Sequence, residues 1–313
     1  MLVVDRTMQR HTILVCDNFG EEFLDNLSKF GKVFQASDID YSLPLDEVTI
    51  LVVRSKTKVN RELVNMMRSL ECVITATHGI DHIDLGYLEE KGIKFFNIPV
   101  QSYDVAQGVI AYLLAHSTNL VEGDRSMKRG EWKKKSLIGY RIKGKTLGII
   151  GCGKIGKEVA KLGFALGMKV IVCDPCISDD KIVIVSLKEL LRTSDFITIH
   201  TPLTEETRHL IGRKEIALMK DDAYLVNTAR GGVIDEEALL EAVRAGKIGA
   251  ALDVYESTPP FNNEVSNSLI KSERVIATPH SIGQTIEAIE EKGKGVLKAI
   301  KDYIAASQNI TKA

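Results

Sequence analysis

Residues 146–174, TLGIIGCGKIGKEVAKLGFALGMKVIVCD, decide the fold of this chain. The stretch opens with an apolar run that predicts a buried strand, and Gly151, Gly153 and Gly156 follow it. Apolar residues then recur at helical spacing, and a second apolar run ends on Asp174. This order predicts a strand, a glycine-rich turn, a helix and a second strand.

The three glycines suit a dinucleotide site. Gly151 permits a tight turn, Gly153 lets the backbone approach a pyrophosphate, and Gly156 lets the helix pack on the strand. The phosphates are expected over the free N–H groups of the helix start, at Lys154 and Ile155, because a helix N-terminus attracts anions. The glycine pattern alone also fits a tightly packed loop, so the prediction depends on the complete unit.

Asp174 indicates which dinucleotide binds. It lies 23 positions after Gly151, where an acid can accept hydrogen bonds from the ribose hydroxyls of NAD. The next residues, PCISDD, add two more acids, and no Arg or Lys lies between Asp174 and Lys181. Since acids repel a 2′-phosphate, NAD is predicted rather than NADP.

Length and charge exclude several classes of protein. A chain of 313 residues predicts two domains. Its 41 basic and 42 acidic residues give a net charge of −1, so neither nucleic acid nor an anionic membrane is an expected partner. The first residues lack the apolar core of a signal peptide, and no apolar run is long enough to span a bilayer. A cytoplasmic protein is expected.

Cys173 and Cys176 form a C-x-x-C pair beside Asp174. A zinc site needs a second such pair, and a thioredoxin motif opens a helix. We therefore interpret the pair as a coincidence and expect no metal site. A disulfide there requires an oxidising or hyperthermophilic cytosol.

The first hundred residues alternate between predicted strands and helices, which is typical of a parallel, doubly wound sheet. The expected strands are 12–17, 50–53, 72–76 and 93–97, and the expected helices are 21–30, 60–69 and 85–90. A long helix at 102–119 then leads to a basic connection at 128–145. We expect a surface arm there, anchored by Trp132 or wrapped around a partner subunit.

Four later strands, expected at 196–199, 224–227, 250–253 and 275–277, end in residues suited to chemistry. Ligands bind where such strands end. A positioned Arg binds a carboxylate through two N–H groups, and a His transfers protons near neutrality. With a nicotinamide cofactor, these groups can oxidise a 2-hydroxy acid, although a single Arg or His is more often a surface or structural residue. The residues at these ends are His200, Thr201, Pro202, Thr228, Ala229, Arg230, Asp253, Thr278 and His280.

The combined motifs resemble the NAD-dependent D-2-hydroxyacid dehydrogenases, in the group of phosphoglycerate dehydrogenases and glyoxylate/hydroxypyruvate reductases. The matching segments are THGIDHID (77–84), GKTLGIIGCGKIG (144–156), HTPLTEETRHLIG (200–212), LVNTARGGVIDEEAL (225–239), AALDVYE (250–256) and TPHSIGQT (278–285). The resemblance implies an α/β protein with a Rossmann cofactor domain (101–285) inserted into a flavodoxin-like substrate domain (1–100 plus 286–313). It also implies a homodimer joined through the cofactor domains.

The resemblance further implies roles for single residues. Arg230 binds the substrate carboxylate and polarises the carbonyl, His280 is the acid/base, and Asp253 positions the nicotinamide side. Substrate contacts are implied for Arg54, Ser55, His78, Gly79, Arg230 and His280, the backbone near His78 and Gly79 holding the carboxylate. Cofactor contacts are implied for Gly151, Gly153, Lys154, Ile155, Gly156, Asp174, His200, Thr201, Pro202, Thr228, Ala229, Arg230, Asp253, His280 and Gly283.

One position departs from the family pattern. Family members usually carry Glu before the proline that follows the Asp253 position, and this Glu pairs with the catalytic His. This chain has Thr258 there. Three explanations remain open. Thr258 itself could orient the imidazole, a nearby acid such as Glu256 or Glu264 could replace the missing Glu, or catalysis could be weaker. We expect a working enzyme, because both catalytic residues remain.

The substrate is less sharply predicted. Arg54, Lys56 and Lys58 follow a strand and resemble the segment that helps phosphoglycerate dehydrogenases bind phosphate, although a solvated loop fits equally well. 3-Phosphoglycerate with 3-phosphohydroxypyruvate, in serine biosynthesis, is the first expectation, and glyoxylate or hydroxypyruvate is the second. Serine feedback is not expected, because the chain ends soon after its last helix. An NAD(H)-sensing corepressor, which binds protein partners and turns over slowly, is the alternative from another class.

Overall fold

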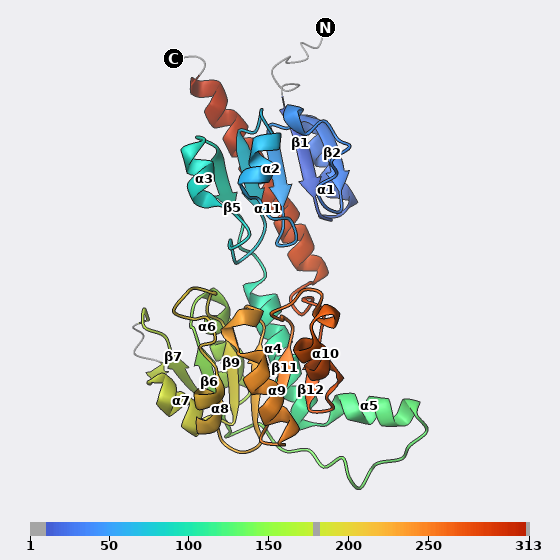
Figure 1. Ribbon diagram of the computed structural model, residues 1–313, viewed down its shortest axis with the longest axis vertical. Helices are drawn as coiled ribbons and strands as arrows, with labels where there is room; N and C mark the ends of the chain where they lie inside the picture. The colour runs from blue at the N-terminus through green and yellow to red at the C-terminus, as the bar shows by residue number, and fades with distance from the viewer. Residues whose placement is uncertain (1–10, 178–181, 311–313) are drawn as a thin grey trace. The chain divides into compact units, whose positions relative to one another are not determined.

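The computed structural model describes residues 11–177 and 182–310, and these divide into two compact units (Figure 1). We call residues 11–100 with 285–310 the terminal unit, and residues 101–177 with 182–284 the central unit. Each unit is built on one parallel sheet. The predicted fold class, two parallel α/β domains, is therefore confirmed.

The terminal unit has a five-stranded sheet with the order β2-β1-β3-β4-β5. This is the flavodoxin-like order, with β1 and β3 adjacent at the point where the strand order reverses. Its strands are β1 (His11–Cys16), β2 (Gly31–Ala36), β3 (Ile50–Val53), β4 (Cys72–Thr75) and β5 (Lys94–Asn97), and its helices are α1 (Glu21–Leu27), α2 (Arg61–Met66), α3 (Leu85–Glu90) and α11 (Ile286–Ile310).

Strand β2 is absent from the sequence prediction. Its residues are exposed or half-buried, with no fully buried position. The apolar signal is weak because β2 lies at the edge of the sheet, where only β1 pairs with it. The first helix is also shorter than expected, since its last turn, Ser28–Phe30, is a 3-10 turn.

Successive residues of β1 show why a buried parallel strand reads as a continuous apolar run. Ile13 and Val15 pack with α1 and α11 on one face, whereas Leu14 and Cys16 pack with α2 and α3 on the other. Both faces of the sheet are covered, so every residue of the strand has a reason to be apolar.

The central unit has a seven-stranded sheet with the order β12-β11-β10-β9-β6-β7-β8. Counted from β6, its first six strands follow the Rossmann order 3-2-1-4-5-6. The strands are β6 (Thr146–Ile150), β7 (Lys169–Cys173), β8 (Val183–Ile184), β9 (Phe196–Ile199), β10 (Ala223–Asn227), β11 (Ile248–Leu252) and β12 (Val275–Ala277).

Helices cover both faces of this sheet. One core joins it to α4 (Ser102–Ser117) and α6 (Lys154–Ala165), which also pack on each other. The other core joins it to α7 (Leu187–Thr193), α8 (Arg213–Leu218), α9 (Glu236–Arg244) and α10 (Glu264–Lys271). As predicted, Asp235 caps α9 by accepting the Ala238 N–H, and Gly246 after this helix has a left-handed φ of 74°.

The expected connection at 128–145 begins differently. The long helix α4 ends at Ser117, and a further helix, α5 (Leu120–Lys128), precedes the connection. Helix α5 and the loop after it extend away from the body of the central unit (Figure 1). The sequence prediction missed α5 because only one of its residues, Ser126, is buried, so no apolar face marks it.

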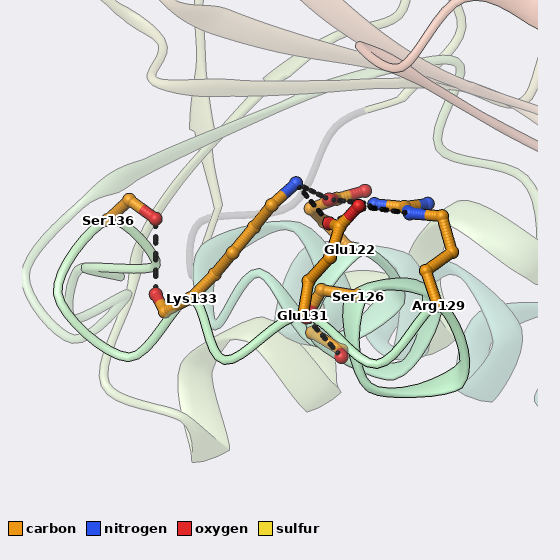
Figure 2. Close-up of polar contacts among 7 residues, drawn as sticks. Glu122, Ser126, Arg129, Glu131, Lys133 and Ser136 are labelled. Atoms are coloured by element: carbon orange, nitrogen blue, oxygen red, sulfur yellow. Dashed lines mark hydrogen bonds and ion pairs between the residues drawn. The ribbon is translucent and has the colours of Figure 1, made fainter.

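Trp132 does not anchor the arm to its own unit, because it is 78% exposed. Instead, four charged residues of α5 and the loop after it pair with one another. Figure 2 shows the carboxylates of Glu122 and Glu131 between Arg129 and Lys133, with N···O distances of 2.8–3.1 Å. Hydrogen bonds from Arg129 and Lys133 lower the pKa of Glu131 to about 2, so the cluster is fully charged at neutral pH.

Among the described residues, no helix is long and apolar enough to cross a membrane, and no cluster of three or more acidic, His or Cys side chains is arranged to hold a metal ion. Cys173 and Cys176 are not joined by a disulfide. The backbone N–H of Cys176 donates to Asp174, so this pair contributes to the turn after β7 through its main chain.

Candidate functional site

The glycine-rich turn after β6 has the geometry of a phosphate cradle. Gly151 has a φ of 84°, and a Cβ there would meet the His200 carbonyl group at 2.9 Å. A Cβ on Gly156 would lie 2.3 Å from the Gly151 oxygen. No atom lies within 4 Å of a Cβ built on Gly153, so the start of α6, at Lys154 and Ile155, is open to a phosphate.

Asp174, at the end of β7, is held beside this turn. Its Oδ2 accepts the N–H of Cys152 at 2.7 Å, and its Oδ1 accepts the N–H of Cys176 at 2.8 Å. Each carboxylate oxygen has further lone pairs, and so can still accept from a ribose hydroxyl. The two backbone hydrogen bonds therefore orient the acid for the role predicted from the sequence.

His200, which begins the loop after β9, is a neutral residue. Burial lowers the pKa of its imidazole to about 3, and its Nε2 lies 2.9 Å from Thr198 Oγ1. Its backbone packs against Gly151. His200, and with it the loop of Thr201 and Pro202, thus forms a wall of the glycine-rich turn.

The loop after β10 carries Arg230 and is held by a residue that the sequence prediction missed. Asn227 is 1% exposed, donates to the Arg230 carbonyl at 2.9 Å and accepts the Ala229 N–H at 3.0 Å. The signal for this role was an Asn at the end of an apolar strand. Within the described chain, the hydroxyl of Thr228 is buried without a hydrogen-bond partner, as expected for a group that contacts a ligand.

Asp253, directly after β11, fastens the loop that carries His280. It is 2% exposed, and its carboxylate accepts from Thr278 Oγ1, from the Ser281 N–H at 2.9 Å and from the Ile282 N–H at 3.3 Å. His280, between these residues, has a left-handed φ of 55°, which costs a non-glycine residue about 1–2 kcal/mol. Asp253 is therefore a positioning residue for the His280 loop.

The predicted residues of the terminal unit lie at the carboxyl edge of its sheet. Arg54 and Ser55 follow β3, and His78 and Gly79 follow the neighbouring strand β4. A polar network holds the second loop: Thr75 Oγ1 lies 3.0 Å from His82 Nε2, and Thr77 Oγ1 donates to the Gly79 carbonyl at 2.7 Å.

Arg54 and Lys56 are less available for a phosphate than the sequence suggests. Arg54 Nη1 lies 3.3 Å from Asp17 Oδ1, and Lys56 Nζ lies 3.6 Å from Asp38 Oδ2. Each cation thus has an acid beside it, which offsets part of its attraction for an anion.

The structure narrows the alternatives at Thr258. Glu256 Oε1 lies 2.5 Å from His209 Nε2, and the Glu256 N–H donates to buried Glu236 at 3.0 Å. Glu256 is thus committed to His209, while Glu264 is an exposed first-turn residue of α10. Thr258 itself is exposed in the loop between β11 and α10.

The residues of the central unit thus converge at one edge of the sheet. The glycine-rich turn, His200, Arg230, Asp253 and His280 all follow carboxyl ends of its parallel strands. Residues 110–281 match the family model described as D-isomer specific 2-hydroxyacid dehydrogenase, NAD binding domain.

The chain belongs to this family.

Two relatives in this dehydrogenase family are similar over most of the chain. A D-3-phosphoglycerate dehydrogenase of Methanocaldococcus jannaschii is 41% identical over 303 residues, which are 93% of this chain and 57% of the relative. A hydroxypyruvate reductase of Thermotoga maritima is 45% identical over 260 residues, 82% of this chain and 85% of the relative. The chain therefore spans little more than half the length of the first relative.

Solved structures of the family agree with the fold. A D-lactate dehydrogenase of Aquifex aeolicus, in complex with NAD and lactic acid, matches with a TM-score of 0.86 at 30% identity, covering 96% of this chain and 97% of that one. The predicted family is thus confirmed, and a cofactor of the NAD type is supported at the level of the family.

The glycine-rich turn allows binding and stability to be separated. In Gly153→Ala we expect the Tm to stay within about 1 °C and the Kd for NADH to rise at least about tenfold, because the methyl group enters open space that a pyrophosphate needs. In the matched variant Gly156→Ala we expect a loss of about 1–3 kcal/mol of stability, because the methyl group meets backbone. Fluorescence titration and thermal unfolding measure the two effects. Unchanged NADH affinity in Gly153→Ala would contradict the placement of the phosphates.

Proposed function

We propose that the protein is an NAD-dependent dehydrogenase that interconverts a D-2-hydroxy acid and its 2-oxo acid. The observation that supports this most is that Arg230 and His280 lie on loops that Asn227 and Asp253 hold at the same sheet edge as the glycine-rich turn. A carboxylate-binding group, a proton-transfer group and a dinucleotide cradle are the parts that this reaction needs.

The residues present fit NAD. The open space at Gly153 suits the pyrophosphate, Asp174 suits ribose hydroxyls, and the buried hydroxyl of Thr228 can donate to the cofactor or substrate. NAD, when bound, accepts the hydride in the oxidative direction and returns it in the reductive one. The acid at Asp174 favours NAD over NADP, because a carboxylate repels a 2′-phosphate.

The chain's own residues bind the substrate and move the proton. Arg230 offers its guanidinium to the substrate carboxylate and stabilises negative charge on the C2 oxygen. In the oxidative direction the imidazole of His280 accepts the C2 hydroxyl proton, and in the reductive direction it returns a proton to that oxygen. The backbone near His78 and Gly79 binds the carboxylate in this proposal.

Two substrate pairs fit these groups. 3-Phosphoglycerate with 3-phosphohydroxypyruvate, in serine biosynthesis, is the first, supported by relatives named D-3-phosphoglycerate dehydrogenase and by the basic loop after β3. Glyoxylate or hydroxypyruvate is the second. It is favoured by the ion pair of Arg54 with Asp17, and by the hydroxypyruvate reductase relative, of which this chain covers 85%.

One assay tests the function and the substrate. NADH oxidation is measured with 3-phosphohydroxypyruvate, hydroxypyruvate and glyoxylate, for the wild type and for Arg54→Ala. If the phosphorylated substrate is the true one, we expect it to be preferred, and Arg54→Ala to lower this preference at least about tenfold, as for the loss of a hydrogen bond between charged groups.

Two outcomes contradict parts of the proposal. An unchanged preference in Arg54→Ala would remove the phosphate-binding role of this residue. NADH binding without turnover of any 2-oxo acid would replace the enzyme by the NAD(H)-sensing alternative.

The proposal includes a homodimer in the cytoplasm. The arm of the central unit, α5 and the loop after it, exposes the apolar side chains of Leu120, Met127, Trp132 and Ile138. Ion pairs among its charged side chains hold the arm in a defined form. Several large apolar side chains exposed on one short segment favour a contact surface there, since contiguous exposed apolar patches mark interaction sites. A second copy is the expected partner, because most soluble oligomers are symmetric assemblies of one chain. Sedimentation equilibrium tests this, and a monomer at micromolar concentration would contradict it.

A further inference from the structure

We propose that Tyr112 is a positioning residue for His280, acting through Thr278 and Asp253; this inference rests on the proposed role of His280 as the acid/base. Tyr112 belongs to α4, which lies outside the sequence segments that carry the family motifs. Its hydroxyl lies 2.5 Å from Thr278 Oγ1, and Thr278 Oγ1 in turn donates to Asp253 Oδ1.

The direction of these hydrogen bonds follows from the number of protons. An ionised carboxylate only accepts, so the single proton of the Thr278 hydroxyl points to Asp253. Thr278 Oγ1 must then accept from Tyr112. Burial raises the pKa of Tyr112 well above its usual value, so its hydroxyl keeps the proton that it donates. The chain of donors therefore runs one way, from Tyr112 to Thr278 to Asp253.

We call this chain of hydrogen bonds, Tyr112 to Thr278 to Asp253, the relay. The carboxylate of Asp253 at its end also binds the backbone that follows His280. Asp253 Oδ1 accepts the Ser281 N–H at 2.9 Å, and the Ile282 N–H lies 3.3 Å from both carboxylate oxygens. Thr278 lies two residues before the strained His280, and Ser281 lies directly after it. Asp253 thus binds the loop on both sides of His280, and Tyr112 orients the Thr278 hydroxyl, one of the three groups that Asp253 binds.

Helix α4 packs closely against this loop. A Cβ on Gly108 would lie 2.3 Å from Ile282 Cγ1, and a Cβ on Gly283 would lie 2.5 Å from Val105 Cγ2. The side chain of Gln101 also donates to the Gly283 carbonyl. With the backbones this close, the Tyr112 hydroxyl reaches Thr278 without a bridging water. The relay thus adds a directional contact to an already tight packing.

The test compares two buried tyrosines of the same core. Tyr112 and Tyr224 pack in one apolar cluster, but the Tyr224 hydroxyl has no hydrogen-bond partner in the described chain. We expect Tyr112→Phe to lower kcat about three- to tenfold, the worth of one hydrogen bond, and to leave the Kd for NADH within about twofold. Amide hydrogen exchange of Ser281 and Ile282 should accelerate in the absence of substrate. Tyr224→Phe should change neither kcat nor the amide exchange of Ser281 and Ile282.

A double-mutant cycle separates the relay from general packing. Thr278→Val removes the middle hydroxyl, so Tyr112→Phe combined with Thr278→Val should lower kcat no further than Thr278→Val alone. Additive losses, or a Tyr112→Phe variant that matches Tyr224→Phe in both kcat and exchange, would overturn the relay. If the wild type reduces no 2-oxo acid, the proposed function fails, and the exchange measurement still decides whether Tyr112 holds the loop.

Discussion

Replacing His280 by glutamine is expected to lower kcat by about 10²- to 10⁴-fold, the usual contribution of a positioned acid/base. Glutamine keeps hydrogen-bonding groups of similar reach but cannot accept the hydroxyl proton. The Kd for NADH should stay within about fivefold of the wild type, because the pyrophosphate cradle lies on the turn after β6. Steady-state rates with a 2-oxo acid and a fluorescence titration measure the two quantities.

His209 provides the matched control for this variant. It is also a histidine with a left-handed φ, 50°, in a loop at the carboxyl edge of the same sheet, and its imidazole is paired with Glu256. We expect His209→Gln to keep kcat within about threefold of the wild type. A His280→Gln enzyme as fast as His209→Gln would show that another group transfers the proton. It would also leave the relay from Tyr112 without a catalytic purpose.

Arg230→Lys is the second variant for which we expect a large effect. The charge stays, but the planar fork that can bind a carboxylate through two N–H groups is lost. Hydrogen bonds between charged groups contribute about 1.5–3 kcal/mol each, so kcat/KM should fall about 10²-fold or more. The fold should be unaffected, because Asn227 holds this loop through the Arg230 main chain.

Both kinetic constants and a control define the outcome for Arg230. If Arg230 both binds the carboxylate and stabilises the C2 oxygen, KM should rise and kcat should fall. Arg213→Lys is the control, because Arg213 is an exposed partner of Glu241 on the surface and should have no kinetic effect. A normal kcat/KM in Arg230→Lys would remove the proposed binding role.

The relation of Glu256 to His209 bears on the missing carboxylate at position 258. For a family member without the usual Glu, the sequence leaves three alternatives: Thr258 orients the ring, a neighbouring acid substitutes, or catalysis is weaker. In the structure, Glu256 is beside another histidine, and its backbone is bound to buried Glu236. Asp253 holds the loop on both sides of His280, through the Thr278 hydroxyl and the backbone N–H groups of Ser281 and Ile282.

Much of the fold could be predicted because its signals are local. The glycine-rich unit, the buried strands and the cap of α9 at Asp235 each depend on a few neighbouring residues, and the structure has them as expected. Strand β2 and helix α5 were missed, because neither carries a buried apolar face that would mark it. Of the two expectations for the arm, an anchor at Trp132 is not what the structure has, since this side chain is exposed, and a contact with a partner subunit stays a prediction.

The sequence alone determined the family, the two parallel sheets and the residues that follow the strands, because strand ends and glycine turns are encoded by adjacent residues. Only the tertiary structure decided which groups hold those residues. Asn227 binds the Arg230 main chain, and Tyr112 meets Thr278 across 166 positions of sequence. Such contacts depend on how α4 packs against the strand ends. A pattern of neighbouring residues cannot predict a contact between side chains so far apart in the sequence. The turn from Gly151 to Gly156 thus predicts that a dinucleotide binds, whereas the contact of α4 with Thr278 is visible only in the structure.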